Sequence, residues 1–160
     1  MAQELGLEAI NTDIYSESLD DNIELNDVGF LMALTGSADI NRYAIDKFSE
    51  QFGENGSFRL ITIDEMNDPD NSPKEGLFSH TDDFIQLSEV ARKFPKIHEI
   101  EINSREHFEK LIEITNNDED IIPLLVKDKK GVLEIISSNN KAIAHIEKGY
   151  KLVYLGKRIK

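Results

Sequence analysis

The amino-acid sequence predicts an α/β fold with two parts: a parallel sheet built as β-α-β-α-β, and after it a small α+β subdomain with antiparallel strands. Two observations support this prediction. In the first half, short apolar runs alternate with segments of helical periodicity, and the connections between them are short. In the second half, a tight turn that contains glycine separates two apolar runs, which is typical of a β-hairpin. The length of 160 residues fits one domain, or one domain with a small appendage.

Apolar runs identify the first elements of the chain. We expect a short strand at Leu7–Ile10, followed by an acidic helical segment that Ser16 caps and that continues to Asn26. The run Phe30–Leu34 contains five apolar residues without alternation. This pattern is typical of a strand covered on both faces, as in parallel sheets.

A helix and a further strand complete the first half. Asp39 is the expected N-cap, and Gly53 stands where a C-terminal glycine cap is expected. The apolar positions between them recur with the period of a helix: Ile40, Tyr43, Ala44, Phe48 and Phe52. The run Phe58–Ile63 is the next expected strand.

A loop rich in Pro, Gly, Asp and Asn follows at residues 64–76, with the sequence DEMNDPDNSPKEG. Clustered carboxylates favour hard cations such as calcium, but the Gly and Glu positions of an EF-hand loop are absent. We therefore interpret the segment as an acidic linker and predict no metal site. The linker divides the chain into two predicted domains, residues 1–76 and residues 77–160.

The second half reads as alternating helices and strands that end in an antiparallel sheet. A helix is expected from its N-cap Thr81 to Phe94, where Pro95 ends it, and a second helix from its cap Ser104 to about Asn116. The expected strands are Lys96–Ile102, Ile121–Lys127, Val132–Ser137 and Lys151–Leu155, with a hairpin turn at Asp128–Gly131.

Composition and charge exclude several classes of protein. The chain carries 31 acidic and 18 basic residues, a net charge of −13, so it repels phosphate backbones and we expect no nucleic-acid partner. Residues 1–83 hold 19 acidic and 4 basic residues, whereas residues 84–160 hold 12 and 14. This asymmetry suggests halves with different roles, although a well-solvated acidic half is the simpler interpretation. No apolar run is long enough to span a bilayer, so we expect no membrane insertion by this segment.

No sequence motif indicates catalysis. The absence of Cys removes thiolate metal sites and thiol chemistry, and the four His residues are not spaced as metal ligands on a helix. The chain also lacks the glycine-rich phosphate loops and the nucleophile elbow. We predict that the protein is not an enzyme and name no catalytic residue.

One loop has the position of a ligand site. In open α/β sheets, loops at the carboxyl ends of parallel strands form the binding crevice. Thr35, Gly36 and Ser37 follow a predicted strand and precede a helix, so their hydroxyls and amides suit an anionic or polar ligand. An ordinary turn between a strand and a helix is the alternative interpretation.

The same residues carry a family resemblance. The run ELGLEAINTDIYSESLDDNIELNDVGFLMALTGSADINRYAIDKFSEQFG resembles the middle of an RCK domain, also called a KTN or TrkA N-terminal domain. Asp13 matches the Asp at a strand end of that family, Leu34–Gly36 matches the loop after the next strand, and Asn41 matches the Asn of the following helix. The resemblance covers about 60 residues, 1–63, and implies a partial Rossmann-like sheet.

The resemblance also carries expectations about binding. It implies that the first strand, its phosphate-binding glycines and the ribose-binding acid lie upstream, so that the chain is N-terminally truncated. It implies an incomplete ligand site formed by Asp13, Thr35, Gly36 and Ser37. Because the phosphate-binding glycines are absent from this chain, we expect no cofactor.

The second half is similar to the cytosolic tail of bacterial sodium/proton antiporters of the CPA1 type. Its closing segment Glu147–Tyr154 is similar to the "xxGDxLxxI" ending of such tails, with Tyr150 where Asp is usual. The resemblance implies a non-catalytic regulatory domain on the cytoplasmic side of the bacterial inner membrane. Its expected partners are the membrane-embedded transporter part of the same protein and a second copy in a homodimer.

Two other functions remain open on the sequence. A regulatory domain of a potassium uptake system or channel has the same fold and a different gate. A small Rossmann-type enzyme that uses carboxylates belongs to another class, and the abundance of Asp and Glu permits it.

Overall fold

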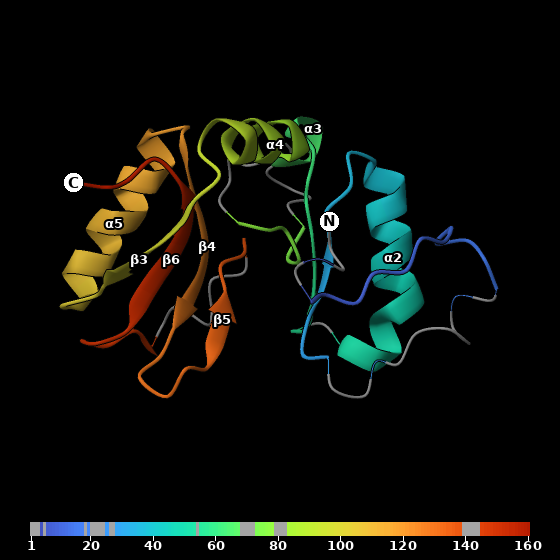
Figure 1. Cartoon of the computed structure of the whole chain (residues 1–160), viewed down its shortest axis with the longest axis horizontal. Helices are drawn as coiled ribbons and strands as arrows, with labels where there is room; N and C mark the ends of the chain where they lie inside the picture. Colours follow the sequence, from blue (N-terminus) through green and yellow to red (C-terminus); the bar gives the residue numbers. More distant parts are fainter. Residues whose placement is uncertain are drawn as a thin grey trace.

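The computed structural model describes residues 4, 6–17, 19, 25, 28–53, 55–67, 73–78, 83–138 and 145–160. Within these residues the fold is mixed α/β with two sheets (Figure 1). A parallel sheet has the order β1-β2, and an antiparallel sheet has the order β3-β6-β4-β5. The predicted combination of a parallel and an antiparallel part is confirmed.

The parallel sheet is one β-α-β unit. Strand β1 (Leu31–Ala33) leads into helix α2 (Ala38–Phe52) and strand β2 (Ser57–Arg59), with Leu31 opposite Ser57. Gly53 is the C-cap of α2, as predicted, and its N–H donates to the carbonyl of Ser49. The predicted N-cap is wrong, because Ser37 accepts the hydrogen bond of the Ile40 N–H, whereas Asp39 lies in the first turn.

Two predicted strands of the first half differ from the structure. Leu7–Ile10 is not a strand: Leu7 and Ile10 are 59% and 45% exposed, and no described residue pairs with the segment. The predicted strand Phe58–Ile63 ends at Arg59, because Thr62 and Glu65 form a capping box that starts the short helix α3 (Ile63–Met66). The predicted helix at 16–26 lies mostly outside the described residues.

The second half follows the predicted order of elements. Helix α4 (Phe84–Lys93) is followed by β3 (Ile97–Glu101), α5 (Arg105–Asn117), β4 (Ile121–Lys127), β5 (Leu133–Ile135) and β6 (Lys151–Gly156). Strand β6 lies between β3 and β4 and is antiparallel to both. Gly131 has φ 89°, as the predicted turn between β4 and β5 requires. The N-cap of α4 is Asp83 instead of Thr81, which lies outside the described residues.

The predicted linker takes part in the fold. The Leu77 N–H donates to the Arg59 carbonyl (2.8 Å), and the Ser138 N–H donates to the Gly76 carbonyl (2.8 Å). Residues 76 and 77 therefore connect β2 with the chain that follows β5. An apolar cluster spans the same junction and contains Phe58, Leu60, Leu77, Phe78, Val90, Ile122 and Ile135. Residues 1–76 and 77–160 thus share a core, and their independence as domains stays a prediction.

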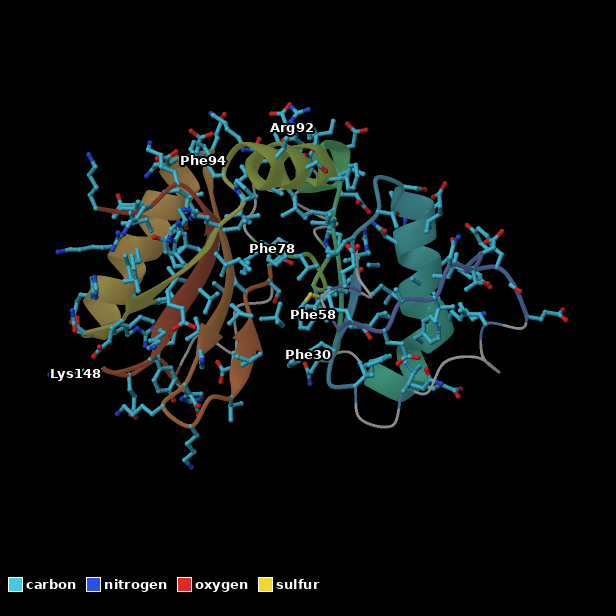
Figure 2. All side chains as sticks on the ribbon, viewed as in Figure 1. Phe30, Phe58, Phe78, Arg92, Phe94 and Lys148 are labelled. Atoms are coloured by element: carbon cyan, nitrogen blue, oxygen red, sulfur yellow. The ribbon has the colours of Figure 1, made fainter. Side chains whose placement is uncertain are left out.

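The sequence predicts that strand β1 is covered on both faces, but part of it is exposed to solvent. Helix α2 lies against one face of the parallel sheet, and on the other face Figure 2 shows Phe30, Phe58 and Phe78 between the two sheets. Phe58 is buried, but Phe30, Met32 and Leu34 are 37%, 37% and 41% exposed. The physical reason is position: the far edge of β2 is bonded to residues 75 and 77, whereas no described residue pairs with the far edge of β1.

Candidate functional site

A groove lies where the sequence places the ligand crevice, at the carboxyl ends of β1 and β2. Its volume is about 260 Å³. It is lined by residues of the loop before α2, of the chain between β2 and α3, and of the start of α4: Thr35, Gly36, Ala38, Asn41, Leu60, Ile61, Thr62, Ile63, Asp64, Asp83, Phe84 and Ile85. Three segments that are distant in the sequence therefore form one site.

Asn41 fixes the floor of this groove. Its side chain is 1% exposed, and its Oδ1 accepts hydrogen bonds from the Thr35 N–H (3.0 Å) and the Thr35 hydroxyl (2.6 Å). Its Nδ2 donates to the carbonyls of Thr35 (2.9 Å) and Leu60 (3.4 Å). One amide group thus joins the end of β1 to the end of β2, and it orients the Thr35 hydroxyl.

Gly36 permits one wall of the groove to form. A Cβ at this position would lie 3.1 Å from Cδ1 of Phe84, closer than an ordinary contact. The Phe84 ring therefore packs against the Gly36 backbone and connects the loop before α2 to the first turn of α4. The ring remains 41% exposed, so its other face is open to solvent.

The charged groups of the groove are acidic. Asp83 caps α4 by accepting from the Gln86 N–H (2.9 Å), and Asp64 lies in the first turn of α3. No Lys, Arg or His is among the described lining residues. The two carboxylates oppose an anionic ligand, so the groove favours a neutral or cationic group over the anion that helix N-termini alone suggest.

A buried arginine holds the chain between β2 and α3. The Arg59 side chain is 3% exposed and forms a bidentate ion pair with Glu65 (2.9 and 3.1 Å) and a further bond to Glu75 (3.0 Å). Burial alone lowers the pKa of Arg59, but the two carboxylates outweigh it and raise this pKa. For Glu65, burial raises the pKa, but bonds from Arg59 and Thr62 outweigh it and lower this pKa. Both groups stay charged, and Thr62 is held in the groove.

The structure does not bring all four predicted site residues together at the groove. Thr35 and Gly36 line the groove, and Ser37 lies beside them as the cap of α2, with its N–H donating to the Thr35 hydroxyl (3.2 Å). Asp13 is not among the lining residues. Its Oδ1 accepts from the Tyr15 N–H (3.0 Å), in a turn where the Tyr15 ring packs on Tyr43 of α2.

A second hollow of about 310 Å³ lies at the other end of α2. It is lined by Ile45, Ser49, Gly53, Asn55, Ser57, Lys74 and Glu75. The Ser57 hydroxyl is buried there and has no hydrogen-bond partner among the residues that the structure describes. Separately, no group of three or more His, Asp or Glu within the described ranges is arranged to hold a metal ion.

Sequence reasoning missed Thr62, Asp64, Asp83 and Phe84. The pattern Thr-x-x-Glu at Thr62–Glu65 is a capping-box signal and was available in the sequence. Asp83 was equally available as a cap before an apolar periodic segment. No local signal places Phe84 against Gly36, because that contact depends on the tertiary fold.

A function for this chain has to be argued from its fold and from this groove, because comparison with known proteins found no match. No protein-family model, no curated protein and no solved structure matches the chain. Among the residues that the structure describes, no helix combines the length and the apolar character needed to cross a bilayer.

Proposed function

We propose that this chain is a non-catalytic regulatory domain of a monovalent cation/proton antiporter, placed on the cytoplasmic side of the bacterial inner membrane. It couples the binding of a ligand or ion to transport. The membrane-embedded part of the same protein is its proposed partner.

The observation that carries the proposal is the loop from Leu34 to Asn41. The residues of this loop carry the resemblance to RCK domains, and they lie at the carboxyl ends of two parallel strands, where such a fold binds ligands. Asn41, which matches the family's helix Asn, holds both strand ends through four hydrogen bonds. This structural role of Asn41 supports the proposal that the chain shares the architecture of RCK domains.

The proposal includes a Rossmann-like sheet larger than β1 and β2. Strand β1 pairs with β2 on one side, and no described residue pairs with its other edge. The partly exposed Phe30, Met32 and Leu34 lie on this strand or directly beside it. An open apolar edge of this kind favours pairing with another strand, and a second copy in a homodimer is the proposed partner. A monomeric mass by light scattering at high micromolar concentration would contradict the dimer.

The proposed mechanism is thermodynamic linkage. A ligand that binds one conformation of the domain better shifts the attached transporter by the difference in binding free energy, and by no more. The groove lies between α2, α3 and α4, so a ligand there contacts the loop before α2 and the start of α4 at once. A change in the distance between these segments is the conformational signal that we propose.

The test uses the full open reading frame that contains these residues. Everted membrane vesicles from cells that lack their own antiporters report sodium-dependent collapse of a pH gradient. We expect activity from the full protein, and an altered dependence on cation concentration when residues 1–160 are deleted. An unchanged cation dependence, or a reading frame without membrane-spanning segments, would contradict the proposal.

A further inference from the structure

The groove combines apolar side chains that point to solvent with acids that pair with no described Lys, Arg or His. Ile63, Phe84 and Ile85 line it and are 57%, 41% and 63% exposed. An isoleucine that is more than half exposed gains little from the core of its own protein. Exposed apolar residues grouped around a hollow are typical of a surface that contacts another molecule.

The size of the groove limits what fits there. Sites for drug-sized ligands and cofactors usually measure about 300–1,000 Å³. A volume of about 260 Å³ is below this range and is open to solvent on one side. The space accommodates one or two side chains of a partner and is too small to enclose a dinucleotide.

The negative charge of the groove determines which sign of charge a partner can carry. Asp64 and Asp83 lie beside the apolar side chains, and the described lining contains no basic residue. The surrounding half of the chain, residues 1–83, has a net charge of −15. At this groove an anionic group is repelled, whereas lysine and arginine are attracted.

We infer that this groove docks a short peptide segment of a partner protein, in which one or two apolar side chains are flanked by Lys or Arg. The apolar side chains contact Ile63, Phe84 and Ile85, and the basic groups pair with Asp64 and Asp83. The inference concerns the groove alone and does not depend on the proposed regulatory role, so either can fail without the other.

The test uses the whole chain, labelled with ¹⁵N, and a short synthetic peptide of alternating leucine and lysine as the probe. We expect amide shifts centred on Gly36, Thr62 and Ile85, and binding that weakens as salt is added. Two control peptides separate the contributions. Glutamate in place of lysine removes the positive charge, serine in place of leucine removes the apolar contacts, and both changes abolish binding.

Matched variants locate the binding site. Asp64→Asn combined with Asp83→Asn removes two charges, and Asn retains the N-cap of α4. We expect this variant to bind the peptide about tenfold more weakly, the size of two surface ion pairs. Asp46→Asn combined with Glu50→Gln removes the same charge from α2 outside the groove lining, and we expect unchanged affinity. Ile85→Ser tests the apolar contact at an exposed position, where folding does not depend on the side chain.

Three results would overturn the inference. One is an equal loss of affinity in the groove variant and in the α2 control, which indicates non-specific attraction to an acidic surface. Another is binding of the glutamate peptide as tight as that of the lysine peptide. The third is a shift of the same amides by an adenine nucleotide at lower concentration than the peptide requires.

Discussion

Apolar clusters pack against both sheets of this protein, but the two sheets differ in how much directional polar bonding accompanies that packing. In and beside the parallel sheet lie two buried polar side chains that each form several bonds, Asn41 (1% exposed) and Arg59 (3% exposed). The antiparallel sheet packs on α5 through an apolar cluster that includes Phe108 and Leu152. Polar bonds are directional and fix atoms in place, whereas apolar burial stabilises without fixing direction. The groove is therefore built on the part of the molecule where directional bonds fix the positions of atoms.

Removal of the charges that pair with Arg59 is expected to have the largest effect. Glu65→Gln combined with Glu75→Gln leaves a buried guanidinium without a counter-charge, which costs about 3–5 kcal/mol of the free energy of unfolding. Gln retains the capping box with Thr62, so the loss reports the charges. Urea denaturation measures it.

The antiparallel sheet offers the control for this change. Glu99 pairs with Lys151 (2.9 Å) on the surface, where both side chains are nearly half exposed. We expect Glu99→Gln to leave the urea midpoint almost unchanged. Equal losses from the two sites would contradict the contrast between the sheets.

Truncation of Asn41 is expected to have the next largest effect. Asn41→Ala leaves the Thr35 N–H and the Leu60 carbonyl without their partner, and we expect a loss of about 2–3 kcal/mol. Asn117→Ala removes only a bond to Glu113 on the exposed surface of α5 and should change the unfolding free energy by less than about 0.5 kcal/mol. Thermal and urea unfolding compare the two variants.

The dependence of stability on pH tests the same contrast between the two sheets, because Glu65 pairs with the buried Arg59. Its folded-state pKa lies below the ordinary value of 4.5, because bonds from Arg59 and Thr62 outweigh burial. The stabilisation is therefore complete above pH 4.5 and is lost as the pH falls through the lowered pKa. Urea midpoints measured from pH 7 to pH 3 should fall less steeply in Glu65→Gln than in the wild type. Parallel curves for the two proteins would show that Glu65 does not carry this dependence.

The smallest expected effect is a gain. The Ser57 hydroxyl is buried and no described residue bonds to it, so Ser57→Ala should raise the unfolding free energy by about 1 kcal/mol. In the other half, the Thr115 hydroxyl is part-buried and donates to the Ile112 carbonyl (2.8 Å). Thr115→Val should lower the unfolding free energy by a similar amount, and a loss from Ser57→Ala would indicate that its hydroxyl is bonded in solution.

The sequence predicts local elements well and the site only in part. The bounds of β4 agree with the prediction because the turn at Asp128–Gly131 ends the strand, and α5 starts after Ser104 because the side chain of Ser104 caps it. The predicted strand at Leu7–Ile10 does not form, because a run of four mostly apolar residues does not specify which strand it pairs with. The position of Thr35 and Gly36 between a strand and a helix predicts their place in the site. The acids and Phe84 that complete the groove come from other segments, and their proximity arises only from tertiary packing.

Amide hydrogen exchange in Asn41→Ala tests the central claim, that directional bonds in the first half hold the groove while apolar packing stabilises the second half. We predict that protection falls in β1, in β2 and in the loop from Leu34 to Asn41, while β4 and β6 retain wild-type protection. An equal loss of protection in both sheets would contradict the account.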